Sequence, residues 1–334
     1  MVIGAILAGG YGKRLGSITS EIPKPLIEIK KDWTIMHKQL FDFKYIGIKE
    51  VYLLVGYKNE KIKEIFGDAW NGIKLHYLVE KEPKGTLYAI NNFLKHIDTD
   101  CLIRNGDIVT DINFNEFVNF AAQSNYDASI VLTKMRSPYG IINLIDDKVI
   151  EFVEKPIINK YINAGIYYFK KSSYEYFDRE YDGRDVEMTV FQDLVASRKM
   201  NAYIENNVFW QSVDSIKDLE NVRKEYENKE DKPWGYEKVV INTEKYMTKK
   251  LYIKKSYQTS MHYHPNKDET MHLISGSGYI LLEDGSKNMM KKDEVIRIKP
   301  NTLHSIVATN NLVLMEYSTP HLEDTVRVKD YYNR

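Results

Sequence analysis

The sequence lacks the features that mark secreted, membrane-spanning and nucleic-acid-binding proteins. Its 334 residues include one cysteine, Cys101, which excludes an internal disulfide and favours a reducing compartment. Lys plus Arg equals Asp plus Glu at 47 each, so no net charge attracts nucleic acid or an anionic membrane. The apolar residues 1–8 have no basic leader, so we expect neither a signal peptide nor a membrane span there. We therefore predict a cytoplasmic protein without nucleic-acid or membrane partners.

The pattern of apolar residues divides the chain into two parts, as its length also favours. From residue 2 to about residue 225, short β-rich runs alternate with helical stretches, which is typical of a doubly wound, mostly parallel α/β sheet. The expected strands include 3–7, 50–55 and 74–79, and the expected helices include 33–45 and 58–66. We therefore predict a Rossmann-like α/β domain at residues 1–230.

A change of composition marks the end of this domain. Residues 221–232 are densely charged and end at Pro233, a pattern that predicts a helix running out into a linker. The runs beyond it alternate with period two and are separated by glycines such as Gly276, Gly278 and Gly285. They are 249–253, 271–274, 279–282 and 295–298. This pattern predicts an all-β barrel at residues 231–334.

A glycine-rich loop follows the first expected strand, where α/β sheets bind their ligands. Gly9, Gly10 and Gly12 let the backbone approach a phosphate chain closely. Lys13 and Arg14 add positive charge. The loop matches neither the phosphate loop of kinases nor the dinucleotide fingerprint, which disfavours an ordinary kinase or dehydrogenase. Taken alone, it could also be an ordinary strand-to-helix turn.

Further motifs follow this loop along the chain. Lys24 stands between two prolines, which stiffen the backbone on either side of it. The other motifs are Glu82-Pro-Lys-Gly85-Thr86, Asn105-Gly106-Asp107, Tyr139-Gly140, Glu154-Lys155-Pro156, Asn163-Ala164-Gly165 and Trp210 with Asp214. Together with the glycine loop, they resemble the sugar-phosphate nucleotidyltransferase family over about two thirds of the chain.

The resemblance implies a role for each motif. Arg14, Lys24 and Asp107 would carry catalysis, because pyrophosphate leaves with several negative charges that must be neutralised. Asp107 and Asp214 would hold Mg²⁺ through oxygen ligands. The nucleotide-binding residues that it implies are Leu7, Gly9, Gly10, Gly12, Lys13, Gly85, Thr86 and Asp107. The sugar-phosphate-binding residues that it implies are Gly140, Glu154, Lys155, Asn163 and Gly165.

Simpler interpretations exist for three of these motifs. Asp107 could be a turn aspartate, and Asp214 could cap a helix that begins near Ser215. Glu154 and Lys155 could form a surface ion pair of little consequence.

The nucleotide base stays open. The spacing from Trp210 to Asp214 and the run 55–58 resemble glucose-1-phosphate cytidylyltransferases, which slightly favours CTP. The run 80–86 resembles guanylyltransferases for heptose and mannose 1-phosphates.

Four potential metal ligands lie in the predicted barrel. His262 and His264 share one face of a strand, and Glu269 follows five residues later. His304 comes where the next hairpin could return to the same barrel mouth. Three imidazoles and a carboxylate suit Zn²⁺, Fe²⁺, Mn²⁺ or Ni²⁺.

This spacing resembles the cupin superfamily, whose fold is a double-stranded β-helix barrel. Residues 232–235, 248–253 and 322–334 further resemble the cupin domain of type II phosphomannose isomerase. The resemblance implies a metal-assisted sugar-phosphate isomerase in which Arg327 binds the phosphate, with Lys250 as a weaker candidate. A metal-poor binding or dimerisation module is the alternative.

We therefore predict an enzyme that converts a nucleoside triphosphate and a sugar 1-phosphate to a nucleotide-sugar and pyrophosphate. It would be similar to mannose-1-phosphate guanylyltransferases or glucose-1-phosphate cytidylyltransferases, with a cupin that is a candidate mannose-6-phosphate isomerase. One rival is a cytidylyltransferase for a non-sugar substrate such as phosphocholine. Another is a non-catalytic sugar-nucleotide sensor. We also expect a homo-oligomer.

Overall fold

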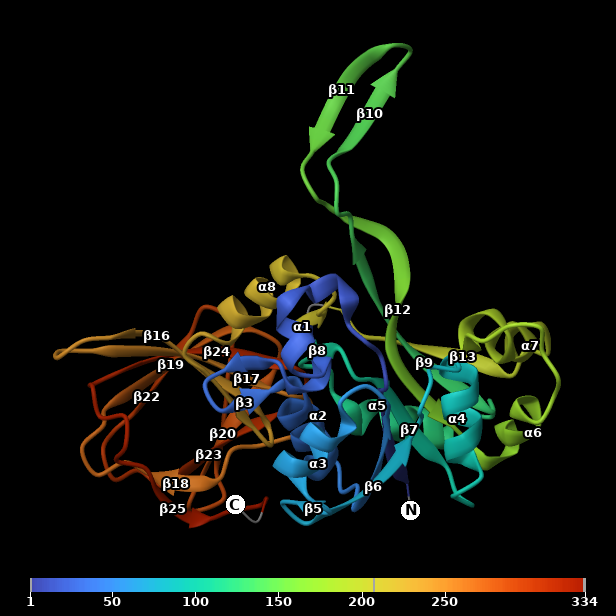
Figure 1. The fold of residues 1–334 in the computed structure, drawn as a ribbon. Helices are drawn as coiled ribbons and strands as arrows, with labels where there is room; N and C mark the ends of the chain where they lie inside the picture. The colour runs from blue at the N-terminus through green and yellow to red at the C-terminus, as the bar shows by residue number, and fades with distance from the viewer. Residues whose placement is uncertain (1, 207, 333–334) are drawn as a thin grey trace. The chain divides into compact units, whose positions relative to one another are not determined.

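The computed structural model describes residues 2–206 and 208–332, and the chain divides into two compact units (Figure 1). The units are Met1–Glu220 and Asn221–Arg334. A functional division at residue 230 stays a prediction. Residues 333 and 334, the end of the C-terminal resemblance, lie outside the described residues. None of the helices in the described ranges is long and apolar enough to span a membrane.

One eight-stranded sheet forms the centre of the first unit. In spatial order its strands are β13 (Met200–Ile204), β9 (Ala128–Arg136), β12 (Ile157–Phe169), β7 (Cys101–Asn105), β1 (Ile3–Ala8), β4 (Glu50–Val55), β6 (Ile73–Val79) and β5 (Ala69–Trp70). The neighbours β7, β1, β4 and β6 run parallel, and β12 runs antiparallel between β7 and β9. The predicted strands at 3–7, 50–55 and 74–79 and the mostly parallel sheet are confirmed.

Helices cover both faces of this sheet, because alternate residues of each strand point to opposite sides. On one face, Ile6 and Leu53 pack in a core with helices α2 (Ile35–Tyr45), α3 (Asn59–Phe66) and α5 (Phe114–Gln123). On the other, Ala5 and Leu54 pack with α4 (Thr86–Leu94), α6 (Tyr174–Phe177) and α7 (Val190–Ala196). The doubly wound architecture is thereby confirmed.

Two loops meet at the carboxyl edge of the sheet. Because β1 and β7 pair in parallel with Leu7 opposite Asn105, the glycine loop after β1 and the turn after β7 lie at the same edge. The strand after that turn, β8 (Ile108–Thr110), pairs with β14 (Trp210–Ser212), which leads into α8 (Ile216–Tyr226). Residues far apart in the sequence are thus collected where α/β sheets bind ligands.

A hairpin projects from the first unit, as Figure 1 shows in green. Its strands β10 (Ile141–Ile145) and β11 (Lys148–Val153) form a two-stranded sheet of their own. Every residue of both strands is exposed.

Two antiparallel sheets form the second unit. The first contains β15 (Lys229–Lys232), β16 (Gly235–Asn242), β17 (Met247–Ile253), β24 (Leu312–Ser318), β19 (Glu269–Ser275) and β22 (Val295–Ile298). The second contains β21 (Lys287–Met289), β20 (Gly278–Leu282), β23 (His304–Ala308), β18 (Met261–Tyr263) and β25 (Val326–Lys329). One apolar core joins both sheets, with Leu251 and Met271 from the first and Ile280 and Ile306 from the second. The all-β prediction is confirmed.

The linker prediction for residues 221–232 is wrong in part. Helix α8 ends at Tyr226, and after a two-residue turn Lys229–Lys232 form β15, which pairs with β16. Lys229 and Asp231 are buried there. A run of charged residues suggests a solvated segment, but here alternate residues of the strand turn inward, and Lys229 pairs with Glu225 at 3.1 Å.

Gly276 in the turn between β19 and β20 yields a stability prediction. Its φ is +88°, and an added Cβ would lie 1.8 Å from the Asn311 carbonyl oxygen. We expect Gly276→Ala to lower the free energy of unfolding of the second unit by about 3 kcal/mol. Urea unfolding followed by the fluorescence of Trp234 measures this, since Trp234 is the one tryptophan of residues 221–334.

Gly285 supplies the matched control. Its φ is +81°, but no atom lies within 4 Å of its added Cβ. Gly285→Ala should therefore cost only the backbone strain, about 1 kcal/mol. Equal losses in the two variants would contradict the steric explanation.

Candidate functional site

A cavity of about 320 Å³ opens at the carboxyl edge of the first unit's sheet. Predicted site residues that line it are Leu7, Gly9, Gly10, Gly12, Lys24, Gly85, Thr86 and Asp107. Lys13 and Arg14 lie outside this lining, because the chain turns into a short 3-10 helix at Lys13. Arg14 instead extends into solvent, with 77% of its side chain exposed.

Sequence reasoning missed part of this lining. Glu80, Pro83 and Asp185 also face the cavity. The first two belong to the run that resembles guanylyltransferases, so their motif was visible although their role was not. No local signal pointed to Asp185, which the fold brings in from far along the chain.

Four charged side chains from four segments converge beside the cavity. Lys24 Nζ lies 3.1 Å from Asp107 Oδ2 and 3.0 Å from Asp214 Oδ1. Arg14 contacts the same Asp214 oxygen at 2.9 Å. Two carboxylates and two cations therefore form one cluster, which can exchange its internal ion pairs for contacts with phosphates.

The surroundings of Asp214 exclude its interpretation as a helix cap. Ser215 and Asp218 cap α8 reciprocally: Asp218 Oδ2 accepts from the Ser215 backbone N–H at 2.8 Å, and Ser215 Oγ accepts from the Asp218 N–H at 3.3 Å. Burial works to raise the pKa of Asp214, but Lys24, Ser212 and Arg14 outweigh it and lower the pKa below its ordinary value. Asp214 is therefore ionised and directed at the cations.

The predicted sugar-phosphate residues separate into two groups. Asn163 and Gly165 lie on β12 beside β7: Asn163 Oδ1 accepts from the Gly165 N–H at 2.7 Å, and a Cβ at Gly165 would lie 2.9 Å from the Asn105 side chain. Since Asn105 lines the cavity, these residues adjoin it. Trp210 Nε1 donates to the Ala164 carbonyl at 2.9 Å and ties β14 to the same place.

Gly140, Glu154 and Lys155 form the other group, at the base of the projecting hairpin. None of the three lines the cavity as the described chain is arranged. Lys155 Nζ pairs with Glu154 Oε1 at 2.9 Å, and both side chains are about half exposed. This is the geometry of the surface ion pair considered from the sequence. Their binding of a sugar phosphate stays a prediction.

A second cavity, of about 570 Å³, lies within the second unit. The predicted residues His262, His264, Glu269, His304 and Arg327 all line it. Strand pairing explains this, because β18 lies between β23 and β25 and places His262 opposite both His304 and Arg327. The two-sheet arrangement adds Glu269 from β19.

Each histidine ring is held by its Nδ1 atom. Nδ1 lies 2.7 Å from the Ser260 carbonyl in His262, 2.8 Å from Asp324 in His264 and 2.9 Å from the Thr302 carbonyl in His304. These oxygens accept, so Nδ1 carries the proton and Nε2 keeps its lone pair. Burial is the main cause that lowers the pKa of His262 to about 3 and that of His264 to about 4, so both rings are neutral.

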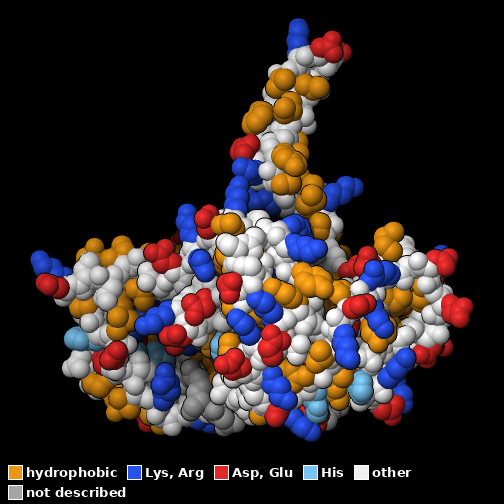
Figure 2. Space-filling view, viewed as in Figure 1, with side chains coloured by type: hydrophobic (Ala, Val, Ile, Leu, Met, Phe, Trp, Pro, Cys, Tyr) orange, Lys and Arg blue, Asp and Glu red, His pale blue; other side chains and the backbone are white. Residues whose placement is uncertain are grey.

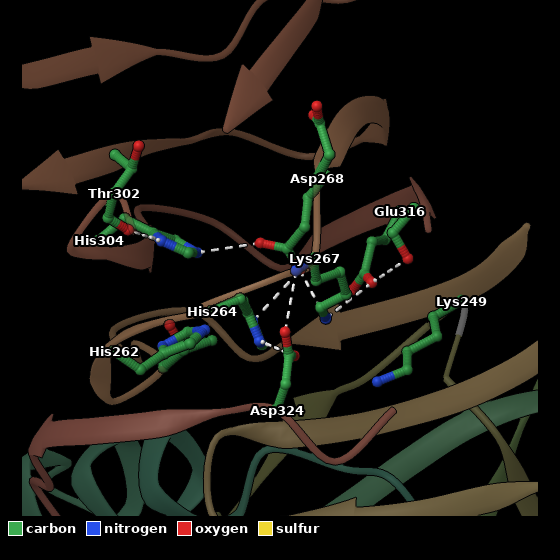
Figure 3. Close-up of polar contacts among 12 residues, drawn as sticks. Lys249, His262, His264, Lys267, Asp268, Thr302, His304, Glu316 and Asp324 are labelled. Atoms are coloured by element: carbon green, nitrogen blue, oxygen red, sulfur yellow. Dashed lines mark hydrogen bonds and ion pairs between the residues drawn. The ribbon is translucent and has the colours of Figure 1, made fainter. Parts of the chain in front are cut away.

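Buried charges surround these rings, and sequence reasoning missed several of them. Figure 3 shows Lys267 directed toward Glu316 and His264 directed toward Asp324. Lys267 Nζ lies 2.7 Å from Glu269 Oε1 and 3.2 Å from Glu316 Oε1, all nearly fully buried. Lys249, rather than the predicted Lys250, faces the cavity, because neighbouring strand residues point to opposite sides.

The donor set fits a divalent metal in its chemistry. Glu269 Oε2 and His304 Nε2 are buried without a hydrogen-bond partner among the described residues. The Nε2 atoms of His264 and His304 stand 3.4 and 3.5 Å from the Glu269 oxygens. Two tetrahedral ligands bound at about 2.1 Å would stand about 3.4 Å apart. Even so, no three His, Cys, Asp or Glu side chains within residues 2–206 and 208–332 are gathered into a metal-holding group as they stand. The oriented rings with free Nε2 lone pairs argue for a metal more strongly than the lack of a gathered group argues against one. The reason is that without a metal these buried polar atoms stay unsatisfied.

Comparison with known proteins follows the same division of the chain. Residues 3–229 match the family model described as nucleotidyl transferase. The chain belongs to the nucleotidyl transferase family. Residues 219–320 match the model described as mannose-6-phosphate isomerase C-terminal.

Relatives of this chain include guanylyltransferases. It is 33% identical to mannose-1-phosphate guanyltransferase of Yarrowia lipolytica over 227 residues, which are 65% of this chain and 61% of the relative. It is 39% identical to D-glycero-alpha-D-manno-heptose 1-phosphate guanylyltransferase of Campylobacter jejuni over 179 residues, 52% of this chain and 77% of the relative. The chain thus spans about 61% of the length of this mannose-1-phosphate guanyltransferase.

Solved structures support the fold of the first unit. HddC from Yersinia pseudotuberculosis superposes with a TM-score of 0.53 at 24% identity, covering 68% of this chain and 100% of that one. A UDP-glucose pyrophosphorylase complexed with UDP-glucose superposes with a TM-score of 0.56 at 15% identity, covering 68% and 98%.

Glu237, which lines the second cavity, yields a prediction about how stability depends on pH. Burial works to raise its pKa, but Lys249 at 3.2 Å and Lys232 at 3.5 Å outweigh burial and lower the pKa to about 2. A carboxylate whose pKa is lowered on folding stabilises the folded state. That stabilisation is fully present above the unfolded pKa of 4.5 and is lost as the pH falls toward 2. Glu237→Gln should therefore cost about 2 kcal/mol at pH 7 and clearly less at pH 3.

Urea unfolding at pH 7 and pH 3 measures this difference. Glu230→Gln is the control, because Glu230 also pairs with Lys232 at 2.8 Å but is 68% exposed. It should change stability by less than about 0.5 kcal/mol. A Glu237→Gln effect that does not shrink at pH 3 would show that packing, not charge, is responsible.

Proposed function

We propose that the first unit transfers a nucleotidyl group from a nucleoside triphosphate to a sugar 1-phosphate. An oxygen of the sugar phosphate attacks the α-phosphorus, a new P–O bond forms, the bond between the α- and β-phosphates breaks, and pyrophosphate leaves. The observation that carries this proposal is the convergence of Arg14, Lys24, Asp107 and Asp214 beside the 320 Å³ cavity. Such a cluster meets the main requirement of the reaction, which is charge neutralisation.

The four residues divide this work. Lys24 forms ion pairs with both Asp107 and Asp214. Its ammonium can therefore move from these carboxylates to the reacting phosphates and still have a negatively charged partner. Arg14 is exposed enough to hold the β- and γ-phosphates as they leave. Asp107 and Asp214 fit Mg²⁺, which needs only one or two carboxylates beside phosphate oxygens and water. When bound, the ion would neutralise charge on the phosphates.

We propose GTP and a mannose or heptose 1-phosphate as the preferred substrates. The named relatives are guanylyltransferases for these two sugar phosphates. The slight preference for CTP drawn from the Trp210–Asp214 spacing has no support among them. A cytidylyltransferase for phosphocholine and a non-catalytic sensor remain outcomes that the assay below distinguishes.

For the second unit we propose a sugar-phosphate isomerase, on the basis of the neutral histidines that converge on Glu269. His262, His264, Glu269 and His304 would hold Zn²⁺, Fe²⁺, Mn²⁺ or Ni²⁺, which supplies a Lewis acid that polarises a carbonyl or hydroxyl. Arg327 lies at the cavity wall, where it would bind the substrate's phosphate.

We further propose a cytoplasmic homo-oligomer that binds small molecules and no nucleic acid. The single cysteine supports the location, since Cys101 is buried and reduced. The equal numbers of acidic and basic residues support the absence of nucleic-acid partners.

Lys24→Ala tests the transferase proposal. Removing the ammonium should lower kcat about 10²- to 10³-fold, as loss of one preorganised charge donor does. Pyrophosphate release with Mg²⁺ measures it, with CTP, GTP, UTP, dTTP and ATP each offered to mannose, glucose, heptose and amino-sugar 1-phosphates and to phosphocholine.

Lys63→Ala is the matched control, because Lys63 also pairs with an aspartate, Asp68 at 3.3 Å, but its side chain is 58% exposed on α3. Its turnover should equal that of the unaltered chain. Near-normal turnover of Lys24→Ala would sink the assigned role. Nucleotide binding without pyrophosphate release from any pair would favour the sensor.

The double variant His262→Ala, His264→Ala tests the ligand set of the second unit. It should lose stoichiometric metal, measured by inductively coupled plasma mass spectrometry on purified protein. His272→Ala, on the opposite face of β19, should keep it. Equal metal content in both variants would rule out the proposed ligands.

A further inference from the structure

We propose that Gln39 is a positioning residue of the transferase site. From inside the core it holds the turn that carries Asp107, and so fixes where the Asp107 carboxylate stands relative to that of Asp214. The inference rests on the proposed nucleotidyl transfer, because Gln39 would act on the reaction only through Asp107. Gln39 itself is fully buried on α2.

The turn Gly106–Asp107 joins β7 to β8, and its backbone is held from two neighbouring segments. The Gly106 N–H donates to the Leu7 carbonyl at 2.9 Å, and the Asp107 carbonyl accepts from the Val213 N–H at 3.0 Å. The second bond ties Asp107 to the residue that precedes Asp214. The separation of the two carboxylates therefore depends on the shape of this turn.

Gln39 bridges the two ends of the turn. Its Nε2 atom lies 3.0 Å from the Asn105 carbonyl oxygen and 3.0 Å from the Ile108 carbonyl oxygen, one residue before the turn and one after it. Both carbonyls can only accept, so the amide must present its two N–H groups to them. Since the Gln39 side chain is 0% exposed, removing its amide takes the bridge away where bulk water does not reach.

Buried charges hold the same turn. On the face of the molecule in Figure 2, blue and red side chains lie at the surface, as charged groups usually do. Lys38, Asp42 and Arg104 are instead at most 5% exposed. Asp42 accepts from Lys38 at 2.7 Å and from Arg104 at 2.9 Å, and Arg104 donates to the Ile108 carbonyl at 3.3 Å. Because burying ions costs free energy, such a cluster contributes a defined geometry more than net stability.

Helix α2 gives the Gln39 amide a fixed base. The helix begins with a reciprocal cap: Thr34 Oγ1 accepts from the His37 N–H at 3.2 Å, and His37 Nδ1 accepts from the Thr34 N–H at 3.2 Å. Leu40 and Phe43 anchor it in the core of the sheet. The turn can therefore move only as far as its bonds to Gln39 allow.

Gln39→Met tests the inference, because methionine fills a similar space without an N–H group. In the pyrophosphate assay we expect kcat to fall about 10- to 100-fold, as when a group that orients a catalytic ligand is lost. The KM for the nucleotide should change less than about 3-fold, since Gly85 and Thr86 belong to another segment of the cavity lining. Circular dichroism should show the variant folded. Gln39→Asn, whose amide is too short to bridge both carbonyls, replaces it if it is not.

A double-mutant cycle shows whether Gln39 acts through Asp107. On the Asp107→Ala background, Gln39→Met should lower kcat by less than about 2-fold more, because the carboxylate that it positions is already gone. A merely structural role would lower kcat by the same factor on both backgrounds.

Hydrogen exchange followed by mass spectrometry needs neither turnover nor a bound metal. The amides of Gly106 and Val213 are bonded to and from the turn, so Gln39→Met should make them exchange about 10-fold faster. Asn91→Leu is the matched control. It also loses an amide–carbonyl bond, from Asn91 Nδ2 to the Phe177 carbonyl at 2.7 Å, but that bond joins α4 to α6. The control should keep kcat and the exchange rates of the turn.

The outcomes separate this inference from the transferase proposal. An unaltered chain that releases pyrophosphate from no substrate pair speaks against the transferase, and hydrogen exchange still decides whether Gln39 holds the turn. Three results would overturn the inference itself: a Gln39→Met variant with the kcat of the unaltered chain, an equal loss on the Asp107→Ala background, or a turn that exchanges no faster.

Discussion

The position of one ammonium group governs the site of the first unit. Lys24 Nζ joins Asp107 and Asp214, residues 83 and 190 positions away along the chain. Without this shared cation, two carboxylates at the edge of one cavity would repel each other. The surrounding structure serves this contact: Ser215 and Asp218 cap α8 and leave Asp214 free, while Trp210 ties β14 to β12 beside the cavity. A cluster that is neutral as a whole can open toward phosphates, since each cation has a new anion to meet.

In the second unit, too, a cation lies between two carboxylates, and there the charged side chains are more deeply buried. Lys267 lies between Glu269 and Glu316, all three nearly fully buried, so its ammonium compensates part of their negative charge. Three histidines beside it are neutral, because burial lowers the pKa of each ring and outweighs the hydrogen bonds from their Nδ1 atoms, which act to raise it. The result is a cavity with ionic compensation on one side and free nitrogen lone pairs on the other. That combination suits a substrate or ion that binds without a change in the net charge of the cavity's side chains.

Much of the fold and part of the site could be predicted from the sequence. The strands at 3–7 and 50–55, the helix that becomes α3 and the period-two runs of the second unit carry local patterns that survive folding. The positions of the glycine loop and Gly85 in the cavity could also be predicted, because the backbone conformation that a glycine permits is a local property. Lys229 and Asp231 were misjudged, since a run of charges does not show which residues will face a partner. Asp185, Lys267 and Glu316 escaped notice for the same reason, as their roles depend on neighbours from distant segments.

The sequence by itself determined the two architectures, the family resemblance and the residue types available for phosphate and metal chemistry, because periodicity and motif spacing are properties of neighbouring residues. Only the tertiary structure decided that Lys24 would stand between two aspartates, that Lys249 rather than Lys250 would face the second cavity, and that Glu154 and Lys155 would form an exposed ion pair at the base of the hairpin. Charges act over a few ångströms and are strongest where water is excluded. Their pairing is therefore set by which strands and turns pack together, which no local pattern in the chain records.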